Sequence, residues 1–183
     1  MLSASGILDF LKKRTGILDG VCFTGGEPLL GDEVLALAGE VKSLGFKVKL
    51  DTNGTFPERL EKAVAENIVD YVAMDIKNSP DKYALTTGGE PALPRVRQSV
   101  DFLLHGKVPY EFRTTVTGKF HETADFSALG RWIAGAENYF LQPFKESGDV
   151  LVPDDDYVVE SGKMAEFLAA VKPFVRNAAI RGQ

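Results

Sequence analysis

The stretch Thr24-Gly25-Gly26-Glu27-Pro28 combines a bare backbone with a carboxylate, directly after a short apolar run. Adjacent glycines lack Cβ atoms, so a ligand can approach their carbonyl groups closely. Glu27 would add a charge-assisted hydrogen bond to a cationic group, whereas it would repel a phosphate. No phosphate-binding pattern of the G-x-x-x-x-G-K-[ST] or G-x-G-x-x-G type is present. The stretch therefore predicts an amine site, with a tight strand-to-helix turn as the alternative.

Further polar residues fall where strands are expected to end. Periodicity predicts strands at 20–23, 46–50, 68–74, 110–116 and 139–141, separated by helices near 7–11, 34–44, 57–64, 96–104, 126–134 and 162–175 and followed by a short extended tail. This alternation predicts an α/β fold with a parallel sheet, in which the carboxyl ends of the strands share one edge. The candidate site residues at that edge are Thr24, Gly25, Gly26, Glu27, Asp51, Thr52, Asn53, Asp75, Lys77, Arg113 and Gln142.

The composition limits the class of protein. The 183 residues suit one domain, and the net charge of −5, with acids and bases interleaved, argues against nucleic-acid binding. No apolar run approaches the ~20 residues of a membrane span, and the start does not read as a signal peptide. The single cysteine excludes an intrachain disulfide and favours a reducing, cytoplasmic location.

The residues that most often hold metals are few. Cys22 lies within a predicted strand and is expected to be a buried structural cysteine rather than a metal ligand. His105 and His121 have no ligand partner at metal-binding spacing, and both are expected to be surface or loop residues. No metal site for an iron–sulfur cluster is therefore predicted within the chain.

Several segments together resemble one family. After the glycine–glutamate stretch come "KVKLDTNGT" from Lys47, "VDYVAMDIK" from Val69, "YEFRTTVT" from Tyr110 and "YFLQPF" from Tyr139. In this order they resemble radical S-adenosylmethionine (radical SAM) enzymes, and most closely the activating proteins of anaerobic ribonucleoside-triphosphate reductase, which are related to pyruvate formate-lyase activating enzymes. The resemblance extends over essentially all of the chain. It implies a partial parallel (β/α) barrel with about five β/α units present.

The resemblance also implies a chemistry. In the family, a [4Fe-4S] cluster reduced by a donor such as flavodoxin or ferredoxin splits S-adenosylmethionine, and the resulting radical takes hydrogen from a glycine of a glycyl radical enzyme. Gly25, Gly26 and Glu27, preceded by Thr24, would hold the methionyl amino group. The methionyl carboxylate would lie near four residues: Asp51, Thr52, Asp75 and Lys77. Asn53 continues the second strand end, and Arg113 and Gln142 would complete the rim.

The two aspartates carry a separate expectation. Asp51 and Asp75 end consecutive strands, so their carboxylates should lie within several ångströms and require a positive group between them. Lys77 is one candidate. The resemblance implies another, a monovalent cation held by the aspartate pair, and the alternative is that both aspartates only form turns.

The sequence departs from the family in one respect. The family binds its cluster through C-x3-C-x2-C, whereas Cys22 is the only cysteine here. Residues 1–183 are therefore expected to be a single, N-terminally truncated radical SAM core without the first strand, the cluster and activity. The exposed edge at 21–23 is expected to be covered by another chain, or by displacement of the helix at 7–11. Alternatives are a short S-adenosylmethionine-binding or partner-docking module, and a protein similar to 7-carboxy-7-deazaguanine synthase, which shares "GGEP" and "TNGT". "AMDIK" and "EFRTT" argue against the latter.

Overall fold

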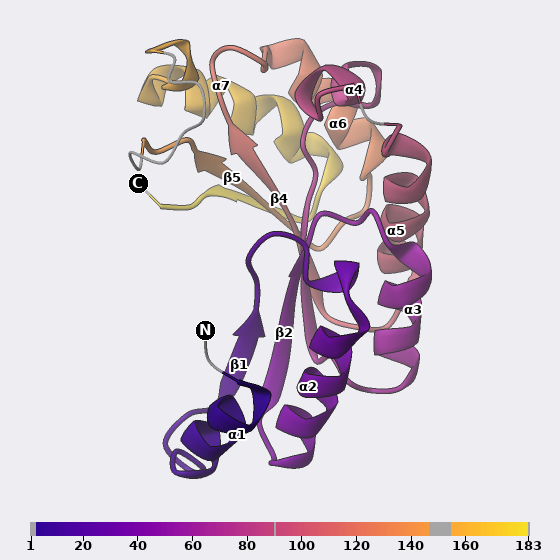
Figure 1. The fold of residues 1–183 in the computed structure, drawn as a ribbon. Helices are drawn as coiled ribbons and strands as arrows, with labels where there is room; N and C mark the ends of the chain where they lie inside the picture. The colour runs from indigo at the N-terminus through magenta and orange to yellow at the C-terminus, as the bar shows by residue number, and fades with distance from the viewer. Residues whose placement is uncertain (1–2, 90, 147–154, 183) are drawn as a thin grey trace.

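The computed structural model describes residues 3–89, 91–146 and 155–182. Within these ranges, six parallel strands form one open sheet whose spatial order is the order of the chain (Figure 1). The strands are β1 (Gly20–Phe23), β2 (Lys47–Thr52), β3 (Tyr71–Asp75), β4 (Tyr110–Val116), β5 (Asn138–Pro143) and β6 (Asn177–Ile180). The predicted α/β partial barrel is confirmed. The sheet gains a sixth strand because the predicted extended tail pairs with β5.

Helices connect the strands. They are α1 (Ala4–Lys12), α2 (Asp32–Ser43), α3 (Pro57–Ala65), α4 (Tyr83–Thr86), α5 (Leu93–His105), α6 (Thr123–Trp132) and α7 (Ser161–Val171), with short 3₁₀ turns η1 (Pro28–Leu30), η2 (Pro80–Lys82), η3 (Asp155–Tyr157) and η4 (Lys172–Phe174). Local chemistry explains several starts: Ser3 caps α1, Pro57 begins α3, and Glu122 with Asp125 forms a capping box on α6. In Figure 1, α2, α3 and α5 lie together on one side of the sheet.

The two faces of the sheet carry different side chains. Leu50, Val72 and Phe112 are at most 2 % exposed and belong to the core under the helices. Their strand neighbours point the other way, because successive side chains alternate between faces. The register pairs Asp51 with Ala73 and Asp75 with Arg113, so the charged members share the second face, which we call the open face.

The turn after β2 has a fixed shape. Gly54 has φ of +75°, a conformation that favours glycine, and a Cβ there would also displace the end of the buried Met74 side chain, whose Cε would lie 2.1 Å away. Its carbonyl accepts a hydrogen bond from Ser99 of α5 at 2.8 Å. The end of β2 is therefore held against the helix layer, which fixes the position of Asn53.

Two environments differ from expectation. The prediction that Cys22 is buried was wrong: it is exposed, because it lies on the edge strand β1 with its side chain on the open face beside Asp51. His121 lies in a loop, as predicted, but it is only 4 % exposed, because the segment between β4 and α6 folds back against the loop after β3. His105 is exposed at the end of α5, as predicted.

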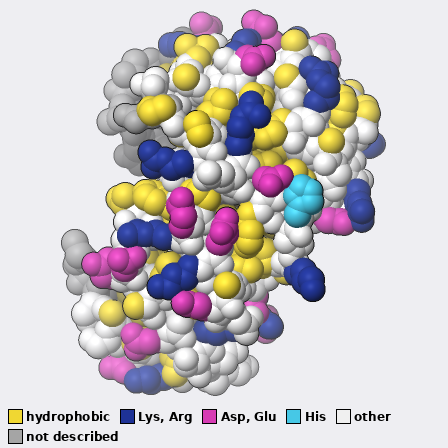
Figure 2. Space-filling model, turned by 90° about the vertical axis from the view of Figure 1, so that its right-hand side faces the viewer, with side chains coloured by type: hydrophobic (Ala, Val, Ile, Leu, Met, Phe, Trp, Pro, Cys, Tyr) yellow, Lys and Arg dark blue, Asp and Glu magenta, His cyan; other side chains and the backbone are white. Residues whose placement is uncertain are grey.

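The outer surface has mixed charge. On the side shown in Figure 2, acidic and basic side chains are interspersed among apolar ones, and neither sign forms a continuous block. In the described part of the chain, no helix combines the length and hydropathy needed to cross a bilayer. The surface in Figure 2 therefore has no single-sign field of the kind that attracts a nucleic-acid backbone.

Candidate functional site

The turn after β1 presents an accessible backbone. Gly25 has φ of +129°, a conformation that favours glycine, and both Gly25 and Gly26 are exposed. A Cβ built on either residue would meet no described atom within 4 Å. Space within the described chain therefore does not explain the absence of a side chain at Gly26, whereas close approach of a ligand to the backbone would.

Glu27 joins the ends of two strands. Its Oε1 accepts hydrogen bonds from the Leu29 amide (3.0 Å) and the Thr52 hydroxyl (2.8 Å), and its Oε2 accepts one from the Asn53 amide (2.6 Å). The first contact caps η1, which Pro28 begins, so the turn interpretation of this stretch holds in part. The other two contacts go beyond a turn, because they tie the glycine turn to β2. A carboxylate oxygen can accept two hydrogen bonds, which leaves Oε2 able to take a further donor.

The residues after β2 form a second turn beside it. The Asn53 side-chain oxygen accepts from the Thr55 amide (2.9 Å) and hydroxyl (2.6 Å), and the Thr52 hydroxyl accepts from the Gly54 amide (3.1 Å). Thr55 is thus engaged with Asn53, and it does not cap α3, whose N-cap position is Phe56. Glu27, Thr52 and Asn53 form one hydrogen-bonded group, as their places at neighbouring strand ends predicted.

A row of alternating charges crosses the open face. The Arg113 guanidinium lies between the two aspartates: Nη1 is 3.0 Å from Asp51 Oδ2, and Nε and Nη2 are each 3.0 Å from Asp75 Oδ1. Lys49 also donates to Asp51, and Lys77 Nζ lies 3.0 Å from Asp75 Oδ2. A positive group does lie between the aspartates, but it is Arg113 rather than the predicted Lys77, which contacts Asp75 alone among the two. A monovalent cation here stays a prediction, and it would have to share both carboxylates with Arg113.

The row changes the ionisation of its members. Burial raises the pKa of Asp51, but hydrogen bonds from Lys49 and Arg113 outweigh burial and hold that pKa below its usual value. Burial lowers the pKa of Arg113, and the two aspartates more than reverse the change. Asp51 and Arg113 are thus both charged at neutral pH, and Arg113 is held in place from two strands.

A second cluster lies towards the amino ends of the same strands. The Tyr71 hydroxyl donates to Glu111 Oε2 (2.9 Å), and Arg181 contacts both Glu111 oxygens at 2.7 and 3.0 Å while covering the Phe140 ring. Burial and the bond to Glu111 raise the pKa of Tyr71 to about 12. Sequence reasoning missed this cluster, although Glu111 lies two residues before Arg113 and so shares its face. That spacing was the available signal.

The remaining predicted residues take outer positions. Thr24 is exposed at the end of β1, and Gln142 lies opposite Thr115 near the end of β5. The structure thus places Lys77 and Arg113 together with the aspartates. Among the described residues, Gln142 makes no hydrogen bond to Glu27 or to the charged row, so its place at the rim rests on the sheet register alone.

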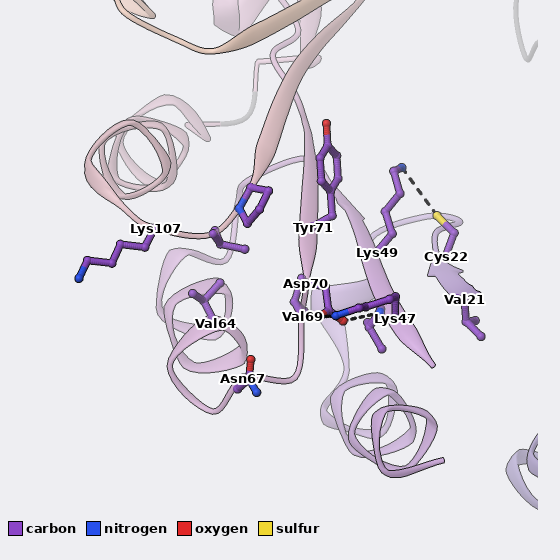
Figure 3. Close-up of a pocket in the computed structure, with 14 residues that line it drawn as sticks. Val21, Cys22, Lys47, Lys49, Val64, Asn67, Val69, Asp70, Tyr71 and Lys107 are labelled. Atoms are coloured by element: carbon purple, nitrogen blue, oxygen red, sulfur yellow. Dashed lines mark hydrogen bonds and ion pairs between the residues drawn. The ribbon is translucent and has the colours of Figure 1, made fainter. Parts of the chain in front are cut away.

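A separate cavity of about 830 Å³ opens at the amino ends of β1, β2 and β3 (Figure 3). Its walls include Val21, Val69 and Pro109, and Asp70 at its floor accepts from the Val48 amide at 2.8 Å. Figure 3 shows Lys107 pointing away and Lys49 turned towards Cys22, so the lysines do not converge. The cavity meets the charged row only at Lys49, which lines the cavity and also donates to Asp51.

The strand-end groups fit an amino-acid-like ligand. Exposed glycine carbonyls and Glu27 suit an ammonium, while Lys77 and Arg113 suit a carboxylate. The chain does not fit an iron–sulfur cluster by itself, because the sequence has one cysteine and such a cluster needs three thiolates to leave one iron open. The described residues also contain no cluster of three potential metal-ligating His, Cys, Asp or Glu side chains.

Comparison with known proteins shows the family and the shared fold. The family model of the radical SAM superfamily matches residues 5–125. A Methanocaldococcus jannaschii protein named as a glycyl-radical enzyme activating enzyme is 31% identical over 95% of this chain and 73% of its own length. The 7-carboxy-7-deazaguanine synthase of Geobacter sulfurreducens is 29% identical over 92% of this chain and 65% of its own. A crystal structure of a domain of pyruvate-formate lyase-activating enzyme from Bacteroides vulgatus has a TM-score of 0.71 at 15% identity, covering 89% of this chain and 99% of that one, which shows a shared fold.

Proposed function

The chain belongs to the radical SAM superfamily, and from that premise we propose that it is the S-adenosylmethionine-binding core domain of an enzyme that activates a glycyl radical enzyme. The observation that carries the proposal is the 31% identity to a protein of that name over 95% of the chain. The glycine turn and the charged row add chemical support. The turn offers hydrogen-bond acceptors for an ammonium group, and the row offers hydrogen-bond donors for a carboxylate group.

S-adenosylmethionine supplies the adenosyl group that the family uses to remove hydrogen from a substrate. The chain's own residues would bind and orient it. Gly25 and Gly26 carbonyls and Glu27 Oε2 would accept from the methionyl ammonium, and Lys77 and Arg113 would hold the carboxylate. The ties from Glu27 to Thr52 and Asn53 would keep these groups in register before the ligand arrives, which reduces the entropy lost on binding.

These 183 residues do not supply all the ligands of the family's [4Fe-4S] cluster. Because the chain contains one cysteine, at least two of the three thiolates would have to come from outside these 183 residues. The roles proposed for this chain are therefore binding and positioning, and no redox step is assigned to its residues. The proposed partners are anaerobic ribonucleoside-triphosphate reductase and a reductant such as flavodoxin or ferredoxin, in the cytoplasm.

The binding part of the proposal is tested by calorimetry with S-adenosylmethionine. Glu27→Gln is expected to weaken binding by about 1.5–3 kcal/mol, the range for a hydrogen bond to a charged group. Glu61→Gln, which changes an exposed acid on α3, is the matched control and should leave affinity unchanged. A sulfonium analogue without the amino group should bind both variants equally. Equal binding of S-adenosylmethionine itself by both would return Glu27 to a purely structural role.

The partner is tested by titrating anaerobic ribonucleoside-triphosphate reductase into the chain, with pyruvate formate-lyase as the comparison. Saturable association with the reductase and weaker association with the lyase are expected. S-adenosylmethionine binding without association with either enzyme would instead favour a short binding module or an enzyme similar to the deazaguanine synthases. The latter has a specific observation in its favour, the 29% identity over 92% of the chain.

A further inference from the structure

His121 is buried directly behind the charged row. Its Nε2 lies 3.0 Å from the Lys77 carbonyl oxygen, and its Nδ1 lies 3.2 Å from the Thr117 amide nitrogen. The ring is 5.6 Å from the ring of Phe126 in α6. His121 thus connects the loop after β4 to the loop after β3, where Lys77 extends to Asp75.

The hydrogen bonds place a proton on one ring nitrogen. Lys77 O can only accept, so Nε2 must carry a proton. Nδ1 lies 3.2 Å from both the amide nitrogen and the carbonyl oxygen of Thr117, so its own contacts do not distinguish an acceptor from a donor. Burial lowers the pKa of His121 and so favours the neutral ring at neutral pH, and a neutral ring with its proton on Nε2 is the Nε2–H tautomer, an assignment made from the hydrogen-bond network.

A neighbouring contact reinforces the connection between the two loops. The Asn78 side-chain nitrogen donates to the Phe120 carbonyl (2.8 Å) and to the Thr86 hydroxyl (2.9 Å). Consecutive residues 77 and 78 are therefore bound to consecutive residues 121 and 120. Since Asn78 orders the backbone after Lys77 by itself, the particular contribution of His121 is to the Lys77 carbonyl.

The charged groups near the ring are already paired. Lys82 Nζ lies 2.9 Å from Asp125 and 3.3 Å from Glu122, and Asp125 also accepts from the Ser79 hydroxyl (3.2 Å) and the Glu122 amide (2.8 Å). His121 has its own partners on Lys77 and Thr117, so its bond to Lys77 does not depend on an ion pair.

We propose that His121 is a positioning residue for the S-adenosylmethionine site. Its Nε2–H holds the carbonyl of Lys77, two residues beyond the end of β3, and thereby sets the direction in which the Lys77 side chain extends. The inference rests on the proposed function, because it assigns Lys77 to the ligand's carboxylate. His121 itself lies behind the row and does not touch the ligand. Its effect on binding should therefore pass through Lys77.

A double-mutant cycle tests whether the effect of His121 on binding depends on Lys77. His121→Phe keeps a ring but removes the donor, and it should weaken S-adenosylmethionine binding about 5–10-fold, as expected for one buried hydrogen bond. Lys77→Met should weaken binding at least as much. In the Lys77→Met background, His121→Phe should cost less than about twofold, because the group it positions is gone. Full additivity of the two changes would overturn the proposal.

Further variants separate positioning from folding. His121→Gln retains an N–H donor and should restore affinity to within about threefold of the unmutated chain. His105→Phe, which changes the exposed second histidine, should have no effect. If His121→Phe fails to fold, the Gln variant decides: full retention of affinity supports the proposal, and loss equal to that of Lys77→Met contradicts it.

The tautomer gives an independent readout. Long-range ¹H–¹⁵N spectra of the ligand-free chain should show His121 protonated at Nε2 only, and the Lys77 carbonyl ¹³C signal should move in His121→Phe. Protonation at Nδ1 would overturn the proposal even if affinities change. Failure of the unmutated chain to bind S-adenosylmethionine would sink the proposed function and this inference together, whereas binding with additive mutations would sink the inference alone.

Discussion

The two faces of the same three central strands differ more than any two separate elements of the molecule. On the helix-covered face, Leu50, Val72 and Phe112 are at most 2 % exposed and belong to the hydrophobic core. One residue along the chain, Asp51 and Arg113 turn to the open face, where each charge has a charged partner. The comparison teaches that strand alternation separates the residues that stabilise the sheet from those proposed to bind S-adenosylmethionine.

The energetic consequences of the two faces also differ. Burial of an apolar side chain contributes roughly 1.5–3 kcal/mol to stability and requires no particular orientation of the groups in contact. The covered face should therefore tolerate replacements of similar volume. Charges lose hydration when they are partly buried, and their mutual attraction only offsets that loss. The open face therefore adds little net stability, while its geometry is specific. Mutations should reveal this division.

The largest effect on stability is expected from the covered face. Phe112→Ala should lower the free energy of unfolding by about 3–5 kcal/mol, because it removes a fully buried ring from the middle of β4. Affinity for S-adenosylmethionine, measured per folded molecule, should stay within about twofold. Urea denaturation and calorimetry at low temperature check the two quantities. A fall in affinity as large as the fall in stability would show that the faces are not independent.

An intermediate effect is expected from the open face. Arg113→Gln should reduce the free energy of unfolding at pH 7 by about 1–3 kcal/mol, because Asp51 and Asp75 lose their shared partner. It should weaken S-adenosylmethionine binding more than about tenfold. Arg95→Gln, an exposed arginine on α5, is the control.

The pH dependence of that variant follows from Asp51. Because the pKa of Asp51 is lowered in the folded chain, its charge stabilises the fold above its ordinary pKa of 3.8, and this contribution is lost as pH falls through the folded value. Arg113→Gln removes part of the contribution. The stability difference between variant and unmutated chain should therefore shrink on acidification below about pH 4. A constant difference from pH 7 to 3 would contradict the assigned role of Arg113.

The smallest effect is expected at the exposed edge of the open face. Cys22→Ser should change stability by less than about 0.5 kcal/mol, as is usual for an exposed position. The native thiol should react fully with a disulfide reagent, at a rate that rises with pH, since burial and nearby Asp51 raise the pKa of Cys22 above 9.0. Protection that increases with protein concentration would show that another copy covers this edge, as the sequence analysis predicted for residues 21–23.

The sequence was most informative where local rules govern the structure. Strand ends carry polar residues, and parallel strands bring their ends to one edge, which is why Glu27 meets Thr52 and Asp51 meets Arg113. The use of these residues for S-adenosylmethionine stays a proposal. The turn at Gly54 was likewise recognisable from its composition.

It was least informative where distant segments meet. The last strand reads Asn-Ala-Ala-Ile and has weak strand propensity, so its pairing with β5 could not be recognised locally. Arg181 reaches Glu111 across 70 positions of the chain. Burial of His121 and exposure of Cys22 both depend on which segments lie alongside them, and spacing within the sequence does not encode that.

The order of the sheet bears on how the chain folds. Within the described ranges, each strand pairs only with its neighbours in chain order, at separations from 22 residues between Lys49 and Tyr71 to 39 between Asn138 and Asn177. The entropy lost on closing a loop grows only with the logarithm of its length, so successive units face similar barriers. During synthesis, each unit that leaves the ribosome finds its neighbour in the sheet already made. Translation order and assembly order then coincide from β1 to β6.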